Sequence, residues 1–265
     1  MAVVEIDRAK VSYRVDGHGP GLVLVHGTGG NGESNWGHLV GRLAADWTVV
    51  RPDYAGSGAT ADDGQPLSVP VLAAQVVGAA RAAGAAPFDL AGFSLGASIA
   101  AYIAAEYPDD VRAVVLLAGF ASGADSRMQL EFGLWRDLIR TDRRAMARLV
   151  LLTGFSPDFV RELTVQQIEE NIDAIVSGNQ WEGMARQVAL DLSLDVSEQA
   201  RRINKPTLVI GCTQDQMVPT AHARALAATI PGARYAELES GHLAPLEKPD
   251  EFVRLMTDFL RAGKQ

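Results

Sequence analysis

Cysteine and positive charge are both scarce in this chain. The 265 residues contain one cysteine, Cys212, which excludes an internal disulfide framework and fits a reducing compartment. The formal net charge is −8, and no basic run could neutralise phosphates, which argues against a nucleic-acid partner. No uninterrupted apolar stretch reaches membrane-spanning length, and the first residues lack the charged and apolar regions of a signal peptide. We therefore expect a cytoplasmic protein without membrane association.

The chain does contain a regular alternation of strand and helix patterns. At 265 residues, with 48% hydrophobic and 21% charged side chains, it can form one large core and an insertion. Continuous apolar runs alternate with helical segments up to residue 117, which predicts right-handed crossovers and a mostly parallel, doubly wound sheet flanked by helices. The predicted strands of this first part are two short strands within 2–15, followed by 22–25, 47–51, 88–91 and 111–117.

The alternation stops between residues 122 and 200. Only helical periodicity is present there, and strands return at 207–211 and 233–238. The predicted helices of this stretch are 128–139, 142–152, 157–176 and 181–192. We therefore predict an α/β core formed by residues 1–121 and 201–265, with an all-helical cap inserted at residues 122–200.

The pattern Gly92-Phe93-Ser94-Leu95-Gly96 lies between a predicted strand and a segment of small, helix-forming residues. A strand, a sharp turn and a helix together form the setting of a nucleophile elbow. The turn forces its central residue into a strained conformation, so the flanking positions must be nearly free of side chain. Ser94 is the predicted nucleophile.

A serine nucleophile needs a base, and the base needs an orienting acid. Of the five histidines, His242 directly follows a sheet strand late in the chain. Asp215 lies between Ser94 and His242 and just beyond the strand at 207–211. All three residues thus follow the carboxyl ends of different strands, where open α/β sheets bind their ligands. Asp125 is a weaker alternative for the acid.

Other residues of the right chemical type have plainer interpretations. His26 is expected to brace a glycine-rich turn, and Cys212 at a strand end is expected to be a buried, small apolar side chain. Asp53 lies in a loop of common structural type. The glycines at 29, 30 and 32 lack the Lys-Ser or Lys-Thr pair of a phosphate-binding loop.

Taken together, these motifs resemble the α/β-hydrolase fold superfamily, in its small, capped, esterase-like branch. The resemblance covers nearly the whole chain and rests on five segments: 26–30, 53–58, 92–96, 215–219 and 240–249. It implies that Ser94 is the nucleophile, His242 the general base and Asp215 its orienting acid. It also implies an oxyanion hole formed by the backbone N–H groups of Thr28 and Leu95. No metal or organic cofactor is expected.

The cap is expected to determine what binds, and its aromatic residues favour a mostly apolar pocket. The residues expected to line this pocket are Gly27, Phe93, Phe120, Trp135, Phe155, Phe159, Trp181 and Leu243. The leading hypothesis is hydrolysis of a carboxylic ester or lactone of a small, largely apolar molecule. A thioesterase, a carbon–carbon bond hydrolase, a lyase or cyclase, and a ligand-sensing protein stay open, because one fold serves many reactions. A homodimer also stays open.

Overall fold

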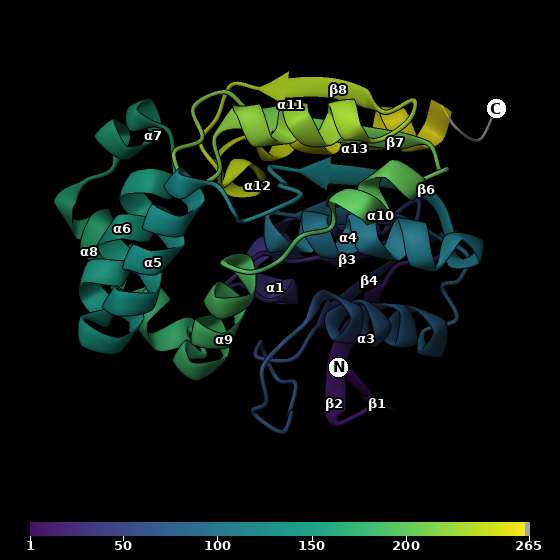
Figure 1. Cartoon of the computed structure of the whole chain (residues 1–265), viewed down its shortest axis with the longest axis horizontal. Coiled ribbons are helices and arrows are strands. Elements are labelled where there is room, and N and C mark those ends of the chain that lie inside the picture. The colour runs from purple at the N-terminus through teal and green to yellow at the C-terminus, as the bar shows by residue number, and fades with distance from the viewer. Residues whose placement is uncertain (263–265) are drawn as a thin grey trace.

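An eight-stranded sheet forms the centre of the computed structural model, which describes residues 1–262 (Figure 1). Its strand order is β1-β2-β4-β3-β5-β6-β7-β8; β1 and β4 pair with β2 in antiparallel fashion, and the other neighbours are parallel. This confirms the predicted mostly parallel sheet. The strands are β1 (Ala2–Ile6), β2 (Ala9–Asp16), β3 (Gly21–Val25), β4 (Thr48–Asp53), β5 (Phe88–Phe93), β6 (Val111–Leu117), β7 (Thr207–Cys212) and β8 (Arg234–Leu238).

Helices cover both faces of the sheet because its central strands are apolar on both sides. One face packs against α3 (Val69–Ala82), α4 (Leu95–Glu106), α10 (Ser197–Arg202) and α11 (Thr220–Thr229). The other packs against α1 (Gly32–Trp36), the 3-10 turn η1 (Gly37–Leu39), α2 (Val40–Leu43) and α13 (Pro249–Ala262). Two short elements, η2 (Pro108–Asp110) and α12 (Ala244–Glu247), complete the set. Within residues 1–262, no helix has the length and apolar character needed to cross a membrane.

A layer of five helices lies beyond the carboxyl ends of the parallel strands, at the left of Figure 1. We call it the helical layer; it consists of α5 (Ser126–Thr141), α6 (Arg143–Gly154), α7 (Pro157–Glu162), α8 (Val165–Gly178) and α9 (Trp181–Asp191). The prediction of one helix over 157–176 was wrong. Thr164 starts α8 as a separate helix, because its hydroxyl accepts the Gln167 N–H while the Gln167 side chain accepts the Thr164 N–H.

The end of the predicted cap, residue 200, falls inside α10. This helix packs on α4 and α11 of the sheet's face, so the helical layer ends with α9. The segment between α9 and α10 returns to the start of the layer, since Asp195 pairs with Ser122 in an isolated bridge. Entry to and exit from the helical layer therefore lie side by side.

Candidate active site

Ser94 lies in the tight turn that joins β5 to α4. Its backbone has φ 56° and ψ −123°, a conformation that residues other than glycine rarely adopt. A Cβ added to Gly92 would lie 2.1 Å from the Gly96 oxygen, and one added to Gly96 would lie 2.3 Å from the Val25 oxygen. The two glycines are therefore required by the close approach of β5, α4 and β3. The turn leaves the Ser94 side chain at the carboxyl end of the sheet.

His242 and Asp215 meet at the same edge of the sheet, after β8 and β7. The His242 Nδ1 lies 2.6 Å from Asp215 Oδ2, and both side chains are buried. Asp215 Oδ1 accepts the backbone N–H groups of Met217 and Val218 at 2.9 and 2.8 Å. The turn after β7 therefore fixes the carboxylate, and the carboxylate in turn orients the imidazole with its Nε2 away from Asp215.

Ser94 and His242 both line one cavity, so the structure brings the three predicted residues together. Among the described residues, the Ser94 hydroxyl and the His242 ring do not hydrogen-bond to each other. Catalytic hydrogen bonds are often long without substrate and shorten in the reacting complex. The arrangement can place a general base next to a hydroxyl once a ligand is bound.

Two backbone N–H groups beside Ser94 donate to no group of residues 1–262. One belongs to Leu95, at the first turn of α4, and the other to Thr28, in the loop after β3. The amides on each side of Thr28 are occupied: Gly27 N–H donates to Asn35 Oδ1 at 2.9 Å, and Gly29 N–H donates to Gln187 Oε1 at 2.8 Å. The two free amides are the pair named from the sequence. They could stabilise a negative oxygen.

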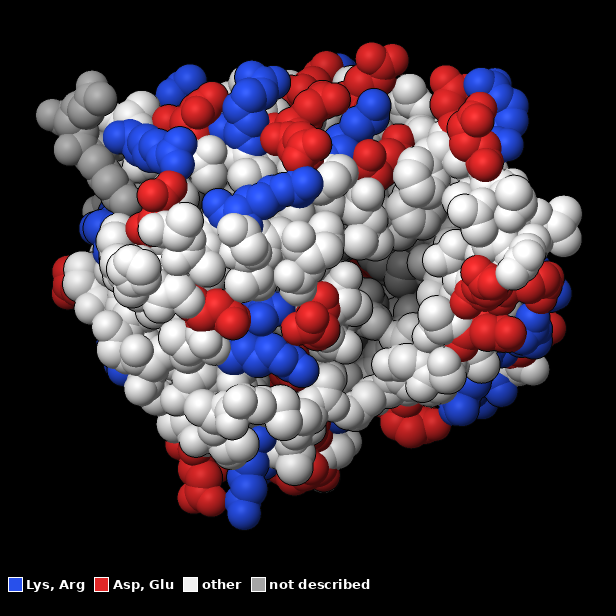
Figure 2. All heavy atoms as spheres, turned by 180° about the vertical axis from the view of Figure 1, so that it is seen from behind, with Lys and Arg blue, Asp and Glu red and all other residues white. Residues whose placement is uncertain are grey.

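The cavity has a volume of about 290 Å³ and lies between the sheet edge and the helical layer. Figure 2 shows a hollow between the main body and the helical layer, with uncharged residues around its mouth. The residues that line the cavity include no Asp, Glu, Lys or Arg within the described part of the chain. Such a cavity suits a neutral, mostly apolar ligand. Of the predicted pocket residues, those that line it are Gly27, Phe93, Trp135, Phe155 and Leu243.

Three predicted pocket residues lie elsewhere. Phe120 is fully buried behind Phe132, with ring centroids 5.9 Å apart. Phe159 stacks on the far side of Phe155, at 4.4 Å, and its ring does not reach the cavity. Trp181 donates its Nε1–H to the Val176 oxygen and packs the end of α8 onto α9. These aromatic rings hold the helical layer together, a role that sequence spacing could not separate from pocket lining.

Sequence reasoning missed much of the helical layer's contribution to the cavity. Asn171 and Ile175 come from one face of α8, Asn179 follows the end of that helix, and Met184 comes from α9. Asparagine side chains are polar, so the sequence pattern does not indicate that this face of α8 is turned toward the cavity. Other lining residues that the sequence did not predict are Val150, Leu151, Met217, Val218 and Leu246.

His26 and Cys212 have structural surroundings. The His26 ring stacks on Tyr54 at 3.9 Å, and its Nδ1–H donates to the Gly27 oxygen. Burial lowers the pKa of His26 to about 4, so the ring is neutral at physiological pH. Burial also raises the pKa of the Cys212 thiol far above its usual range, which keeps it protonated and unreactive.

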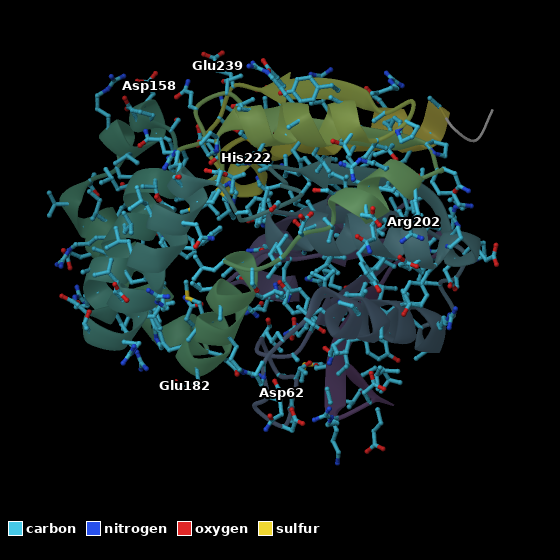
Figure 3. The ribbon with its side chains drawn as sticks, in the orientation of Figure 1. Asp62, Asp158, Glu182, Arg202, His222 and Glu239 are labelled. Atoms are coloured by element: carbon cyan, nitrogen blue, oxygen red, sulfur yellow. The ribbon has the colours of Figure 1, made fainter. Side chains whose placement is uncertain are left out.

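The two alternative acids serve local structure. Asp125 caps α5 by accepting the Arg127 and Met128 N–H groups, and it lies 3.1 Å from Nε2 of His222, which Figure 3 labels on α11. Asp53 accepts N–H groups from Gly32 and Ala59 and ties two loops together. Neither contacts His242.

Comparison with known proteins agrees with this architecture. Residues 22–255 match the model of the alpha/beta hydrolase family. The pyrrolizixenacetamide deacetylase of Xenorhabdus hominickii is 58% identical over 260 residues, covering 98% of each chain. The pimeloyl-[acyl-carrier protein] methyl ester esterase of Xanthomonas campestris is 29% identical, covering 94% of this chain and 98% of that one. The crystal structure of the enol-lactonase from Burkholderia xenovorans superimposes with a TM-score of 0.88 at 27% identity, covering 98% and 100%.

The sheet order, the strand-to-helix turn at Ser94 and these matches agree over nearly the full length of the chain. The similar proteins are hydrolases by name, and the chain is an enzyme of that kind. It belongs to the alpha/beta hydrolase family.

Proposed function

We propose that this protein is a serine hydrolase that works through an acyl-enzyme on Ser94. The observation that carries the proposal is the 2.6 Å contact between His242 Nδ1 and Asp215 Oδ2, in the cavity's wall beside the Ser94 elbow. His242 Nε2 takes the hydroxyl proton as Ser94 Oγ attacks the carbonyl carbon, and the Thr28 and Leu95 amides bind the oxyanion. The same proton passes to the leaving group. Water then attacks the acyl-enzyme, assisted by His242, and releases the acid.

The substrate class that we favour is an acetamide carried by a small, apolar molecule. Support comes from the Xenorhabdus relative, whose name describes removal of an acetyl group from an acetamide and which is 58% identical over 98% of this chain. The uncharged lining of the cavity supports a neutral substrate body. Hydrolysis would give acetate and the free amine, which leaves as the neutral species after taking the proton from His242.

A carboxylic ester or lactone is the second candidate. The Xanthomonas relative is named a methyl ester esterase, and the Burkholderia structure is that of an enol-lactonase. Both reactions need the same nucleophile, base and oxyanion donors, because each passes through a tetrahedral intermediate with one negative oxygen. The two candidates differ in the leaving group, since an amine must be protonated as it departs, whereas a weakly basic enolate or p-nitrophenolate need not be.

A fluorophosphonate probe read by intact-mass spectrometry tests the nucleophile. We expect one adduct on the wild type, none on Ser94→Ala, and an unchanged adduct on the control Cys212→Ala. A p-nitrophenyl ester and a p-nitroanilide with matched acetyl and hexanoyl groups then report the leaving group and the acyl length. Repeated turnover on either, lost in Ser94→Ala, supports an enzyme over a ligand-sensing protein. Full activity in Ser94→Ala would contradict the proposal.

A further inference from the structure

Two polar side chains of α9 reach across to the loop that follows β3. Gln187 Oε1 accepts the Gly29 N–H at 2.8 Å, and Asp191 Oδ2 accepts the Thr28 hydroxyl at 2.6 Å. Both side chains are completely buried. They stand four residues apart, so they lie on one face of the helix, one turn from each other. Together they hold the Thr28 side chain and the peptide that follows it.

Helix α9 is itself held firmly against a different part of the core. Its Gly183 lies so close to Gly56 that an added Cβ would stand 2.1 Å from the Gly56 oxygen. Gln187 Nε2 also donates to Ser57 Oγ at 2.7 Å. On the outer side, Arg186 pairs with Asp62 at 2.8 Å; Figure 3 shows Asp62 in the loop next to α9. The helix is therefore a fixed support for the Thr28 loop.

Packing alone does not account for an aspartate at position 191. Its Oδ1 is buried and has no hydrogen-bond partner, and no Lys or Arg of residues 1–262 forms an ion pair with it. A buried carboxyl group with one partner is costly, and an apolar side chain would fill the same space at lower cost. Burial raises the pKa of Asp191 to about 7. The neutral form, present at and below that pH, places no negative charge beside the site of a developing oxyanion.

We propose that Gln187 and Asp191 are positioning residues for the oxyanion hole. By fixing the Gly29 amide and the Thr28 hydroxyl, they aim the free Thr28 N–H at the carbonyl oxygen of a substrate bound above Ser94. The inference rests on the proposed function and deepens it. It makes the helical layer a part of the chemical step, in addition to lining the cavity.

A misaligned donor loses an interaction that forms fully only in the transition state. Such a change lowers kcat and kcat/KM together and leaves KM nearly unchanged. Complete loss of one oxyanion donor reduces kcat by about 10²- to 10³-fold, so a loosened donor should cost on the order of tenfold or more. A contribution to packing alone would lower stability without this signature.

The test measures kcat and KM of the wild type, Gln187→Ala, Asp191→Ala and Asp191→Asn on p-nitrophenyl acetate and on its thiono analogue. Sulfur accepts hydrogen bonds weakly, so a sound oxyanion hole favours the oxygen ester. We expect both alanine variants to lose on the order of tenfold or more in kcat on the oxygen ester. Their loss on the thiono ester should be smaller, and the ratio of the two rates should fall. Asp191→Asn keeps an acceptor for Thr28 and should retain the wild-type ratio.

Leu190→Ala is the matched control, because Leu190 is a buried α9 residue that packs in the core cluster. It should lower thermal stability and leave the oxygen-to-sulfur ratio unchanged. If both polar variants keep kcat and the ratio, the inference is overturned; equal losses on both esters, matched by Leu190→Ala, overturn it too. If Ser94→Ala keeps its activity on the same esters, the proposed function fails instead.

Thr28→Val provides a second variant should the alanine changes unfold the protein. It removes the hydroxyl that donates to Asp191 and keeps a branched side chain and the backbone N–H. We expect the same loss of kcat and the same fall in the ratio of the oxygen-ester rate to the thiono-ester rate. Combining Thr28→Val with Asp191→Ala should cause no further loss, since both changes break the same contact. Additive losses in the double variant would show that the contact does not act through Thr28.

Discussion

The strand-end loops and the helical layer share one cavity, yet their side chains are held in place in different ways. Ser94, Asp215 and His242 follow strands that are fixed by their neighbours in the sheet, and local backbone bonds fix the turns. In the helical layer, α5, α6, α8 and α9 each contribute lining residues from one face and leave other faces open. Leu130, Leu152 and Val165 of these helices are 76%, 62% and 79% exposed.

The contrast shows where change is tolerated. A substitution near Ser94 meets backbone atoms that cannot move independently, whereas a substitution on an outer face of the helical layer meets solvent. We infer that the residues at the sheet edge carry out the proposed reaction. A few inward side chains of the helical layer would then determine which substrate shapes fit the cavity. Helix α9 is the exception, because its polar residues reach the sheet-edge loop.

The largest expected effect lies on the sheet side of this comparison. Asp215→Asn should lower kcat by about 10⁴-fold, because the amide stabilises the wrong tautomer of His242. The Asn oxygen can still accept from Met217 and Val218, so the thermal unfolding temperature should stay close to that of the wild type. The control is Asp125→Asn, which changes a helix cap and should keep kcat. Loss of activity in the control alone would transfer the acid role to Asp125.

Next in size is a change of backbone packing at the elbow. Gly96→Ala places a methyl group 2.3 Å from the Val25 oxygen and 2.4 Å from the His26 oxygen. We expect a loss of about 3 kcal/mol in the free energy of unfolding, since neither backbone can move away without disturbing the sheet. Urea denaturation followed by circular dichroism measures it. An unchanged midpoint would mean that the elbow is less tightly packed than the sheet around it.

The third expected effect is a pH dependence of stability caused by Asp191, the α9 residue that contacts the Thr28 loop at the sheet edge. Asp191 has an unfolded pKa near 3.8 and a folded pKa of about 7, because burial disfavours the charged form. Between pH 3.8 and pH 7 the native state therefore binds a proton at Asp191 that the unfolded state has lost. The stability gained from this proton is fully present below pH 3.8 and is lost as the pH rises toward 7. Asparagine does not titrate, so Asp191→Asn removes this loss. The free energy of unfolding of the variant relative to the wild type should therefore rise by about 2 to 3 kcal/mol from pH 5 to pH 8.

Thermal unfolding of both proteins at the two pH values checks this, and the comparison cancels titrations that they share, such as that of His26. Tyr54 also feels Asp191, whose negative charge raises the tyrosine's pKa in addition to the larger effect of burial, but it stays protonated in this range. A constant difference between variant and wild type would show that Asp191 titrates normally.

The smallest effect is expected on the outer side of the helical layer. Gly133 lies inside α5, and an added Cβ there would meet no atom within 4 Å. Gly133→Ala should therefore raise the free energy of unfolding by about 0.5 to 1 kcal/mol, because alanine loses less conformational entropy in a helix. Gly133→Ala would then stabilise the protein while Gly96→Ala destabilises it, which is the difference expected between an open helix face and the packed sheet edge. A loss of stability would show that this face of α5 is not free.

Sequence alone predicted the mostly parallel sheet and the run of helices that interrupts the alternation after residue 117. Both signals are local: continuous apolar runs for strands buried on two faces, and a period of 3.6 for helices. The segment 157–176 has the period of one helix throughout, because the break at Thr164 depends on a capping interaction and not on a change of period.

The candidate site divides in the same way. Ser94, His242 and Asp215 could be named because each follows a strand, and the carboxyl ends of parallel strands share one edge. The pocket could be named only in part. Phe120 and Phe159 have the composition of pocket residues, but in the structure one lies behind Phe132 and the other stacks on Phe155.

The order of the strands, the strained turn at Ser94 and the chemical groups at the sheet edge thus follow from the sequence. Which face of each helix in the helical layer is turned toward the cavity depends on the tertiary structure. It also decided that Asp191, 163 residues from Thr28 along the chain, meets that loop. Periodicity describes how one helix repeats along its own axis. How two elements distant in sequence approach each other depends on the packing of all the side chains between them.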